Sequence, residues 1–543
     1  MIKAKQHISN LAAILVSSGI SGVVISPGSR NAPLIRAFVS YNVKIYSVID
    51  ERSAAYFALG IALQTKIPAV LICTSGTAVL NYAPAVAEAF YQQVPLLVLT
   101  ADRPPEAIYQ NENQTIFQEA VYGKNCKKAF TLHCEPETED DLHNAIDISS
   151  EAYQLCVSGN KGPVHINIPL REPLYDALPV PGELSNLNVK EPGILPHEQL
   201  DKELFKNNST VLFVIGQHEK NTRLQDVVNG LLRRNFVIYA EPISNIQGKG
   251  IFTSGGFISD KLPNPDVVIF TGGQVVSKQM NIYLKSLKDT LFIQFSYSER
   301  MHQPFNHSCK MIKGEMYQSA NILNKLEPDA NFNNAWQSEL NKWRQKRDLY
   351  INEIPFSDIT CAQELSKHIQ KNAVIFLGNS SAIRYMQMFD LSADEVFANR
   401  GTSGIDGSLS TTVGIANGTN KNVFAILGDI SFLYDSNGLW NNYLPGNLKI
   451  IVFNNGGGEI FKLINDPENI KDILPYQQTR QNIELAKLCA VYGVEYFEVK
   501  ENKDFSDAFA KFSFEMKNPA LMEIKSSSVE NALTFKNFIK KLK

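Results

Sequence analysis

Short apolar runs alternate with helical stretches along most of this 543-residue chain. Strands of a parallel sheet are buried on both faces, so they are typically continuous apolar runs, and each needs a long crossover before the next strand. The alternation therefore predicts α/β domains with largely parallel sheets. In the first part of the chain the predicted strands are 21–26, 44–49, 68–73, 95–100 and 162–169.

The same alternation of apolar runs and helical stretches occurs twice more along the chain, which predicts three successive α/β domains. We expect them at 1–180, 190–340 and 356–543, with a proline-rich linker near 173–196 and a connecting helix over 333–354. The middle domain is Rossmann-like but lacks GxGxxG after its first strand, which favours a structural role. Its strands and those of the third domain are predicted at 210–215, 236–240, 266–273, 291–296, 373–378, 395–399, 422–427, 448–453, 494–499 and 520–524.

The composition is typical of a globular protein of the cytoplasm. Hydrophobic residues make up 44% and charged residues 20% of the chain, and the net charge of −3 gives no basis for binding nucleic acid or an acidic membrane surface. The seven cysteines are scattered without a CxxC spacing, which argues against disulfides and a zinc site. No run approaches the ~18 apolar residues of a membrane span. We therefore expect a cytoplasmic protein without nucleic-acid or membrane partners.

Two polar turns follow two predicted strands of the third domain. Asp429 follows the strand 422–427 after one glycine, Gly428, and Asn455 follows the strand 448–453 after one residue, Asn454. Because parallel strands that end side by side bring such turns to one edge of the sheet, a carboxylate, an amide oxygen and a backbone carbonyl could hold Mg²⁺ and, through it, a phosphorylated cofactor. The alternative is that both are ordinary turns.

Glu51 is the candidate acid of the first domain. Asp50 is predicted to cap a helix that runs from Glu51 toward Gln64 and is rich in alanine. A carboxylate at this junction, flanked by small apolar residues, could exchange protons near neutral pH. The alternative is an exposed first-turn glutamate that interacts only with the helix dipole.

Cationic side chains lie beside turn residues at several predicted strand ends. Such ends carry the ligand-binding loops of α/β proteins, and a guanidinium can bind a carboxylate through two parallel hydrogen bonds. Any one of them could be a surface ion pair, but together they indicate an anion pocket. They are Arg30, Arg103, Lys278, Arg384 with Ser380, and Arg400.

Seven segments together resemble thiamine-diphosphate-dependent enzymes and, among these, the carboligase family of the menaquinone pathway. The resemblance runs through the whole chain in the same order, although 190–340 matches mainly in architecture. It implies a first domain that binds the aminopyrimidine and a third that binds the diphosphate through Mg²⁺ or Mn²⁺. It also implies a homo-oligomer, dimer or tetramer, with active sites at the subunit interface. The segments are 26–34, 50–60, 74–89, 96–106, 399–414, 428–439 and 454–461.

The resemblance assigns the cofactor residues. Glu51 matches the catalytic glutamate that hydrogen-bonds the pyrimidine N1′, and Ile405 matches the apolar residue that supports the bent cofactor. Asp429, Asn455 and the Gly457 carbonyl match the metal ligands. The other implied cofactor-binding residues are Thr74, Gly76, Gly404, Gly428, Ile430 and Ser431.

The resemblance also implies the reaction, which is decarboxylation of 2-oxoglutarate and 1,4-addition of the succinyl group to isochorismate. Both substrates are dicarboxylates, which gives the cations a purpose. Gln114 is the second implied catalytic residue and would orient a water or intermediate. The resemblance implies that 2-oxoglutarate is bound by Ser380, Arg384 and Arg400. It implies that isochorismate is bound by Ser29, Arg30, Arg103, Asn113, Gln114, Lys278 and Gln279. An apolar wall around the succinyl chain would consist of Ile460, Phe461 and Ile464.

The chain departs at three positions from the pattern of the wider superfamily or of some relatives, although the carboligase family itself usually has a larger apolar residue at the first of them. Ile430 replaces the glycine of the wider superfamily, Gln279 stands where some relatives have a second cation, and Gly456 where some have a third asparagine. Two other interpretations stay open. One is a related enzyme, such as a 2-oxoacid decarboxylase or an acetohydroxyacid-synthase-like carboligase, and the other is a non-catalytic binding protein that keeps the fold.

Overall fold

The computed structural model describes residues 3–182, 197–205, 209–297, 303–458, 460–464, 467–514 and 517–542. Most of the predicted linker therefore lies outside the described residues. Within them the chain forms three sheets, and every strand pair whose register is known runs parallel. The prediction of three α/β layers with largely parallel sheets is confirmed.

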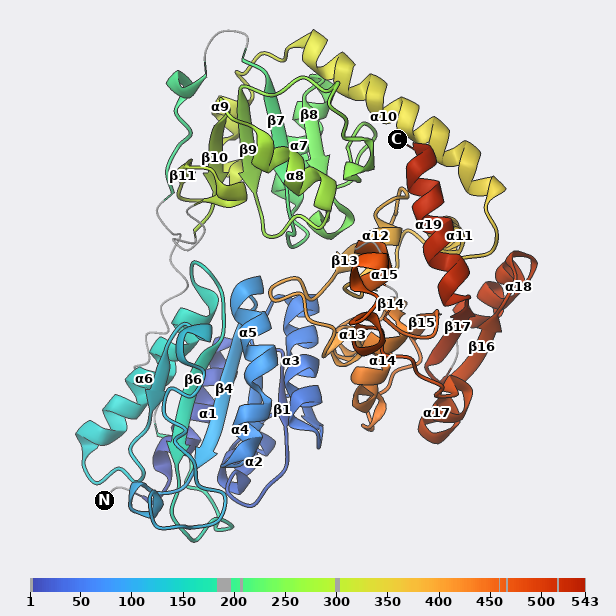
Figure 1. The fold of residues 1–543 in the computed structure, drawn as a ribbon. Helices are drawn as coiled ribbons and strands as arrows, with labels where there is room; N and C mark the ends of the chain where they lie inside the picture. Colours follow the sequence, from blue (N-terminus) through green and yellow to red (C-terminus); the bar gives the residue numbers. More distant parts are fainter. Residues whose placement is uncertain are drawn as a thin grey trace. The chain divides into compact units, whose positions relative to one another are not determined.

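The first sheet has the strand order β2-β1-β3-β4-β6-β5. One face packs on α1, α2 and α6 through a buried apolar cluster, while α3, α4 and α5 gather together away from that cluster (Figure 1). The strands are β1 (Gly22–Ile25), β2 (Ile45–Ser47), β3 (Ala69–Cys73), β4 (Leu96–Asp102), β5 (Ala129–Thr131) and β6 (Val164–Pro169). The helices are α1 (Gln6–Ser18), α2 (Ala32–Val39), α3 (Glu51–Thr65), α4 (Thr77–Asn81), α5 (Ala83–Gln92) and α6 (Glu139–Val157).

The second sheet has the order β11-β10-β9-β7-β8. The predicted connecting helix is present as α10, and its Trp336, Leu340 and Trp343 are buried. The strands are β7 (Val211–Ile215), β8 (Val237–Ala240), β9 (Val267–Thr271), β10 (Leu291–Phe295) and β11 (Cys309–Ile312). The helices are α7 (Thr222–Arg233), α8 (Lys278–Ser286), α9 (Ala320–Leu323) and α10 (Ala330–Tyr350).

The third sheet has the order β13-β12-β14-β15-β17-β16, so β14 and β15, the strands of the predicted metal site, are neighbours. The strands are β12 (Val374–Leu377), β13 (Glu395–Phe397), β14 (Val423–Gly428), β15 (Leu448–Asn454), β16 (Glu495–Val499) and β17 (Ala520–Lys525). The helices are α11 (Asp358–His368), α12 (Ser381–Met386), α13 (Ser408–Asn417), α14 (Asp429–Tyr434), α15 (Ile460–Ile464), α16 (Leu474–Gln477), α17 (Leu485–Tyr492), α18 (Asn502–Ser513) and α19 (Ser528–Leu542).

The chain divides into two compact units that are each discontinuous in sequence. The first comprises 1–194, 399–420 and 434–448, and the second comprises 195–398, 421–433 and 449–543. The first unit therefore contains the first sheet together with α13, and the second contains the other two sheets. The domain boundaries expected from the sequence stay predictions.

Helices α3 and α13 pack backbone to backbone inside the first unit. A Cβ on Gly60 would lie 2.0 Å from the Thr411 carbonyl oxygen, and one on Gly414 would lie 2.0 Å from that of Phe57. Between them the Ser53 and Ser410 hydroxyls are 2.9 Å apart. Only glycine permits this approach, so the sequence sets the distance between the two helices.

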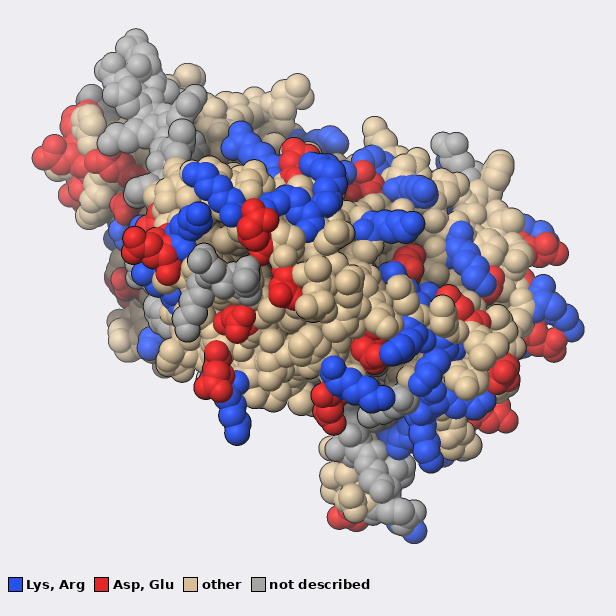
Figure 2. All heavy atoms as spheres, turned by 90° about the horizontal axis from the view of Figure 1, so that it is seen from above, with Lys and Arg blue, Asp and Glu red and all other residues tan. Residues whose placement is uncertain are grey.

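Lysine and arginine are interspersed with aspartate and glutamate on the face drawn in Figure 2. Ion pairs such as Lys220 with Asp394, at 2.7 Å, occur among the described residues. The presence of both signs matches the small net charge of −3. Among the described residues no helix is both long and apolar enough to cross a membrane.

Candidate active site

Asp429 and Asn455 follow adjacent strands of the third sheet, as the sequence predicted. Asp429 comes directly after β14 and Asn455 directly after β15. The backbone N–H of Gly457 donates a hydrogen bond to the Asp429 carboxylate, so the two turns are in contact. Both side chains are buried, with 3% and 7% of their surface exposed.

The Asp429 carboxylate is buried without a strong counter-charge. Burial raises its pKa to about 6, the charge of Asp358 adds to the rise, and the Ile430 N–H and the Gln481 side chain oppose it. The bonds are 2.8 Å from Ile430 N to Oδ1 and 3.5 Å from Gln481 Nε2 to Oδ2. Such a carboxylate is a good ligand for a cation, because the cation replaces the hydration that burial removes.

The amide of Asn455 has one satisfied end and one unsatisfied end. Its Nδ2 donates to Oδ2 of Asp358 at 3.0 Å, whereas its Oδ1 is buried and has no hydrogen-bond partner. A buried carbonyl oxygen without a donor is costly unless a ligand completes it. The described residues contain no group of three or more His, Cys, Asp or Glu side chains suited to a metal. A site of one carboxylate, one amide oxygen and one backbone carbonyl needs no such group and fits Mg²⁺ or Mn²⁺.

The turn after β15 depends on glycine. Gly457 has φ of +103°, and a Cβ there would lie 1.9 Å from the Thr479 carbonyl oxygen. Gly456 has φ of +81° but nothing within 4 Å of the place of a Cβ. The segment around Thr479 therefore lies directly against Gly457, whose carbonyl is the third predicted metal ligand.

The remaining residues predicted for this side surround the same turns. Ile430 and Ser431 form the first turn of α14 after Gly428, and the Ser431 side chain is buried. Ile460 and Phe461 begin α15 and are half-buried, whereas the side chain of Ile464 lies outside the described residues.

In the first unit, Glu51 is the first residue of α3. Asp50 caps the helix as predicted, because its Oδ1 accepts a bond of 3.0 Å from the Ser53 N–H. The half-buried Glu51 faces the carboxyl end of the first sheet. Burial raises the pKa of Cys73 and the pKa of Tyr82, and the negative charge of Glu51 raises both further.

Thr74, Gly76 and Gln114 come together beside the end of β3. A Cβ on Gly76, which has φ of +83°, would lie 3.2 Å from the Gln114 Cα. The Gly76 N–H donates to Oε1 of buried Gln118 at 2.8 Å, and the buried Thr74 hydroxyl has no partner. Gly28, in the loop after β1, closes against Thr74, since a Cβ there would lie 2.5 Å from the Thr74 Cβ.

Arg30 and Arg103 form a cationic pair at the ends of β1 and β4. Burial lowers the pKa of Arg30, and the nearby charge of Arg103 lowers it further. Arg30 donates to the Leu170 carbonyl at 2.8 Å and pairs with Glu172 at 3.2 Å, yet the buried Nε of each arginine has no partner. Ser29 and Asn113 are exposed nearby in sequence. Two close guanidinium groups with spare donors are suited to an anion.

The segment that carries Arg400 and Ile405 is fixed to the first sheet by side chains that sequence reasoning missed. Buried Glu88 of α5 accepts bonds of 2.7 Å from the N–H groups of Gly401 and Thr402 and one of 2.6 Å from the Thr402 hydroxyl. Tyr56 of α3 donates to Asp406 at 2.7 Å. An isolated acidic residue within the apolar helix 83–92 was the available signal for Glu88.

Packing within the Gly404-Ile405-Asp406 motif explains why its first residue is glycine. A Cβ on Gly404 would lie 2.2 Å from Oδ1 of Asp406, the carboxylate that Tyr56 holds. Gly404 thus lets the motif fold tightly, with half-buried Ile405 at its centre.

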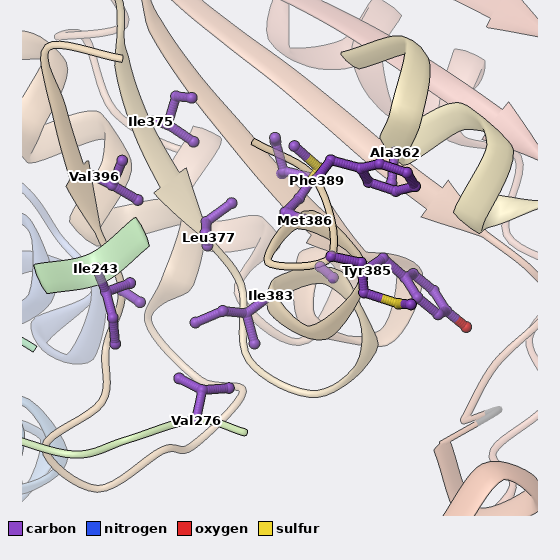
Figure 3. Packing of buried hydrophobic residues seen from close by; sticks show 14 of the residues in the cluster. Ile243, Val276, Ala362, Ile375, Leu377, Ile383, Tyr385, Met386, Phe389 and Val396 are labelled. Carbon is purple, nitrogen blue, oxygen red and sulfur yellow. The ribbon is translucent and has the colours of Figure 1, made fainter. Parts of the chain in front are cut away.

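Ser380 and Arg384 lie together in the second unit. Arg384 Nη1 donates to the Ser380 carbonyl at 2.5 Å, and burial lowers the pKa of Arg384. Helix α12, which carries Arg384, is held by its apolar residues. Figure 3 shows Ile383, Tyr385 and Met386 in one core cluster with Ile375, Leu377 and Val276.

Lys278 and Gln279 are exposed in the first turn of α8. A second missed carboxylate, buried Glu241, holds the loop before them. It accepts bonds of 2.6 Å from the Val276 N–H and 2.7 Å from the Ser277 N–H. The predicted residues thus divide by unit, with Glu51, the Arg30 pair and Arg400 in the first and the Asp429 turns, Arg384 and Lys278 in the second.

Two sequence-family models match the chain. The thiamine pyrophosphate enzyme N-terminal TPP binding domain matches residues 8–121, and the corresponding C-terminal TPP binding domain matches residues 378–524. The first match contains Glu51 and the second contains Asp429 and Asn455. Three parallel sheets and these two matches define a thiamine-diphosphate-dependent enzyme.

Full-length relatives define the family. Proteins from Cytophaga hutchinsonii and Flavobacterium johnsoniae are each 36% identical over 98% of this chain and 98% of their own length. One from Bacteroides fragilis is 33% identical over 100% of both chains. All three are 2-succinyl-5-enolpyruvyl-6-hydroxy-3-cyclohexene-1-carboxylate synthases. The chain belongs to this synthase family, and it is a transferase that uses thiamine diphosphate.

Proposed function

We propose that the chain decarboxylates 2-oxoglutarate and adds the succinyl group to isochorismate by 1,4-addition, a step of menaquinone biosynthesis. The observation that carries the proposal is the 36% identity, over 98% of the chain, to synthases of that product. The candidate acid Glu51, the buried oxygens of Asp429 and Asn455, and the separate cationic groups support the proposal, because the reaction needs groups of these kinds.

Asp429, Asn455 and the Gly457 carbonyl would hold Mg²⁺ or Mn²⁺, and the turn at Gly428, Ile430 and Ser431 would bind the diphosphate. Thr74, Gly76, Gly404 and Ile405 would contact the rest of the cofactor. When bound, thiamine diphosphate supplies a carbon nucleophile and accepts the electrons released as carbon dioxide leaves a 2-oxo acid.

Glu51 would hold a proton at the pyrimidine N1′. A half-buried carboxylate at the start of α3 can accept or donate at that atom, and the Asp50 cap fixes the turn that carries it. Gln114 would orient a water or the reacting group for a second proton transfer.

The cations would bind the substrate carboxylates. Arg384, with Ser380, and Arg400 would bind 2-oxoglutarate, because a guanidinium matches a carboxylate in shape and charge. Arg30 and Arg103 would bind isochorismate, helped by Ser29, Asn113, Gln114, Lys278 and Gln279. Ile460, Phe461 and Ile464 would exclude water from the succinyl chain.

We further propose a cytoplasmic homo-oligomer, a dimer or a tetramer, whose active sites lie at the subunit interface. Sedimentation of the protein with bound cofactor would measure the assembly. A monomer that retains full activity would contradict this part of the proposal.

The assay supplies 2-oxoglutarate and isochorismate with thiamine diphosphate and Mg²⁺, and measures carbon dioxide and the succinyl product together. We expect equal amounts of both and none without the cofactor. Faster turnover of pyruvate would instead indicate another carboligase or decarboxylase. Cofactor binding without turnover of any 2-oxo acid would indicate a non-catalytic protein.

The Glu51→Gln variant tests the assigned acid. It keeps the size of the side chain but cannot exchange the proton, so we expect cofactor binding close to that of the wild type and a loss of turnover of about 10²- to 10⁴-fold. Near-normal turnover would refute the role.

A further inference from the structure

Asp358 is a fully buried carboxylate for which neither the sequence motifs nor the proposed mechanism has a role. It is the first residue of α11, and none of its surface is exposed. Its Oδ2 accepts from Asn455 Nδ2 at 3.0 Å and from Asn531 Nδ2 at 2.8 Å, and its Oδ1 accepts from the Ser526 hydroxyl at 2.7 Å. All three partners belong to the second unit.

The hydrogen bond from Asn455 Nδ2 to Asp358 determines which end of the Asn455 amide has no partner. An ionised carboxylate only accepts hydrogen bonds, so it binds the NH₂ of an amide and repels the carbonyl oxygen. An amide can otherwise rotate by half a turn at little cost in shape. With Nδ2 held by Asp358, the Oδ1 of Asn455 must lie on the opposite side, where it is buried and without a partner.

We propose that Asp358 is a positioning residue that presents the Asn455 oxygen to the divalent cation. This inference rests on the proposed role of Asn455 as a metal ligand. Groups that orient a ligand's oxygen or nitrogen affect metal affinity nearly as strongly as the ligand itself. Without the carboxylate, the amide can turn its NH₂ group toward the cation, which binds oxygen and repels an N–H donor.

The primary measurement is the Mg²⁺ dependence of thiamine diphosphate binding. Mg²⁺ is titrated into metal-free protein at fixed thiamine diphosphate, with heat or the thermal unfolding midpoint as the readout. For Asp358→Asn we expect affinity for Mg²⁺ to fall by about 10- to 100-fold. Ser526→Ala is the matched control, because it removes the hydroxyl that donates to Asp358 Oδ1 but leaves the bond that Asn455 Nδ2 donates to Asp358 Oδ2 in place. A structural role alone would lower the unfolding midpoint of both variants and leave their Mg²⁺ affinities equal.

A double-mutant cycle separates orientation from charge. If Asp358 acts through the Asn455 amide, Asp358→Asn has no further effect in an Asn455→Ala background. If its negative charge attracts the cation directly, the same loss appears in both backgrounds, and the inference is overturned. If wild-type cofactor binding needs no Mg²⁺, the proposed metal site fails. If it needs Mg²⁺ but Asp358→Asn binds as tightly as the wild type, only the inference fails.

If Asp358→Asn does not fold, a variant in which the carboxylate and the amide change places tests the inference instead. It combines Asp358→Asn with Asn455→Asp, which restores one N–H donor between the two side chains and presents an oxygen to the cation. It is made together with Asn531→Ala, so that no second amide faces position 358. We expect its Mg²⁺ affinity to lie within about threefold of that of Asn531→Ala alone, and a tenfold or larger deficit would overturn the inference.

Discussion

Oε1 of Glu88 accepts a hydrogen bond of 2.7 Å from the backbone N–H of Gly401, a residue 313 positions later in the chain. The second oxygen of the same carboxylate accepts from both the N–H and the hydroxyl of Thr402. One buried side chain of α5 thus fixes the backbone that follows Arg400, so the position of that arginine depends on the first sheet.

Replacing Glu88 with alanine should loosen this segment. Two backbone N–H groups would lose their acceptor, so we expect the free energy of unfolding to fall by about 2 to 3 kcal/mol. If Arg400 binds 2-oxoglutarate, the KM for that substrate should rise on the order of tenfold. Gln92→Ala is the control, because it removes another donor to Glu88 and leaves the Gly401 and Thr402 bonds intact. Equal KM values for the two variants would contradict the argument.

Gly457→Ala should damage the proposed metal site, whereas Gly456→Ala should do so much less. Both residues have positive φ and share a conformational cost of about 1 to 2 kcal/mol. Only at position 457 does the new Cβ meet a backbone oxygen, at 1.9 Å. We therefore expect Mg²⁺-dependent cofactor affinity to fall at least about tenfold for Gly457→Ala alone, measured by titration calorimetry. Similar losses for both variants would show that the contact with Thr479 is unimportant.

The packing of α3 on α13 predicts a steep cost for Gly60→Ala. The added methyl group would lie 2.0 Å from the Thr411 carbonyl oxygen, so the helices must separate, and we expect a loss of about 3 kcal/mol in denaturant unfolding. Gly418→Ala is the comparison, because its nearest neighbours are Cβ and Cγ of Gln64 at 3.0 Å, and the nearest backbone atom is 3.3 Å away instead of 2.0 Å. A Gly60→Ala protein as stable as Gly418→Ala would rule out the close packing.

Asp435 should make stability depend on pH. Burial raises its folded-state pKa to about 7 from a usual 3.8, and the N–H and hydroxyl of Ser410 oppose the rise. Between these values the folded state holds the proton that the unfolded state has released, so stability falls as pH rises from about 4 to about 7 and then levels off. Asp435→Asn should flatten this slope in denaturant midpoints measured from pH 5 to 8.

The control for this slope is Asp394→Asn. Lys220 and Lys421 bind that carboxylate and hold its pKa below its ordinary value despite the opposing effect of burial, so it stays ionised throughout this range. Its removal should shift all the midpoints together without changing their slope. An unchanged slope in Asp435→Asn would mean that the pH dependence arises elsewhere.

All fifteen strands that the sequence predicted are present, and most of them coincide with a continuous apolar run. The two strands missed, Ala129–Thr131 and Cys309–Ile312, are short edge strands that are partly exposed. Exposure on an edge removes the need for a continuous apolar run, so the local pattern carries no signal.

The candidate site also contains residues that the sequence predicts and residues that it does not predict. Residues such as Asp429 and Asn455 were accessible to sequence reasoning because each follows its own strand, and neighbouring strands bring them together. Glu88 and Asp358 were not, because their partners lie 313 and 97 positions away and only the folded chain pairs them. A buried carboxylate in an apolar helix signals that a partner exists, but not which one.

The pairing of α3 with α13 has a consequence for protein synthesis. Ser53 and Ser410 are separated by 357 positions. At about 5 to 20 residues per second, a ribosome needs roughly 20 to 70 seconds to span them. Throughout that interval the glycine-containing face of α3 has no α13 to cover it, and the strands of its sheet are complete once Pro169 has been made. The first unit can therefore reach its final packing only after α13 (Ser408–Asn417) has been made.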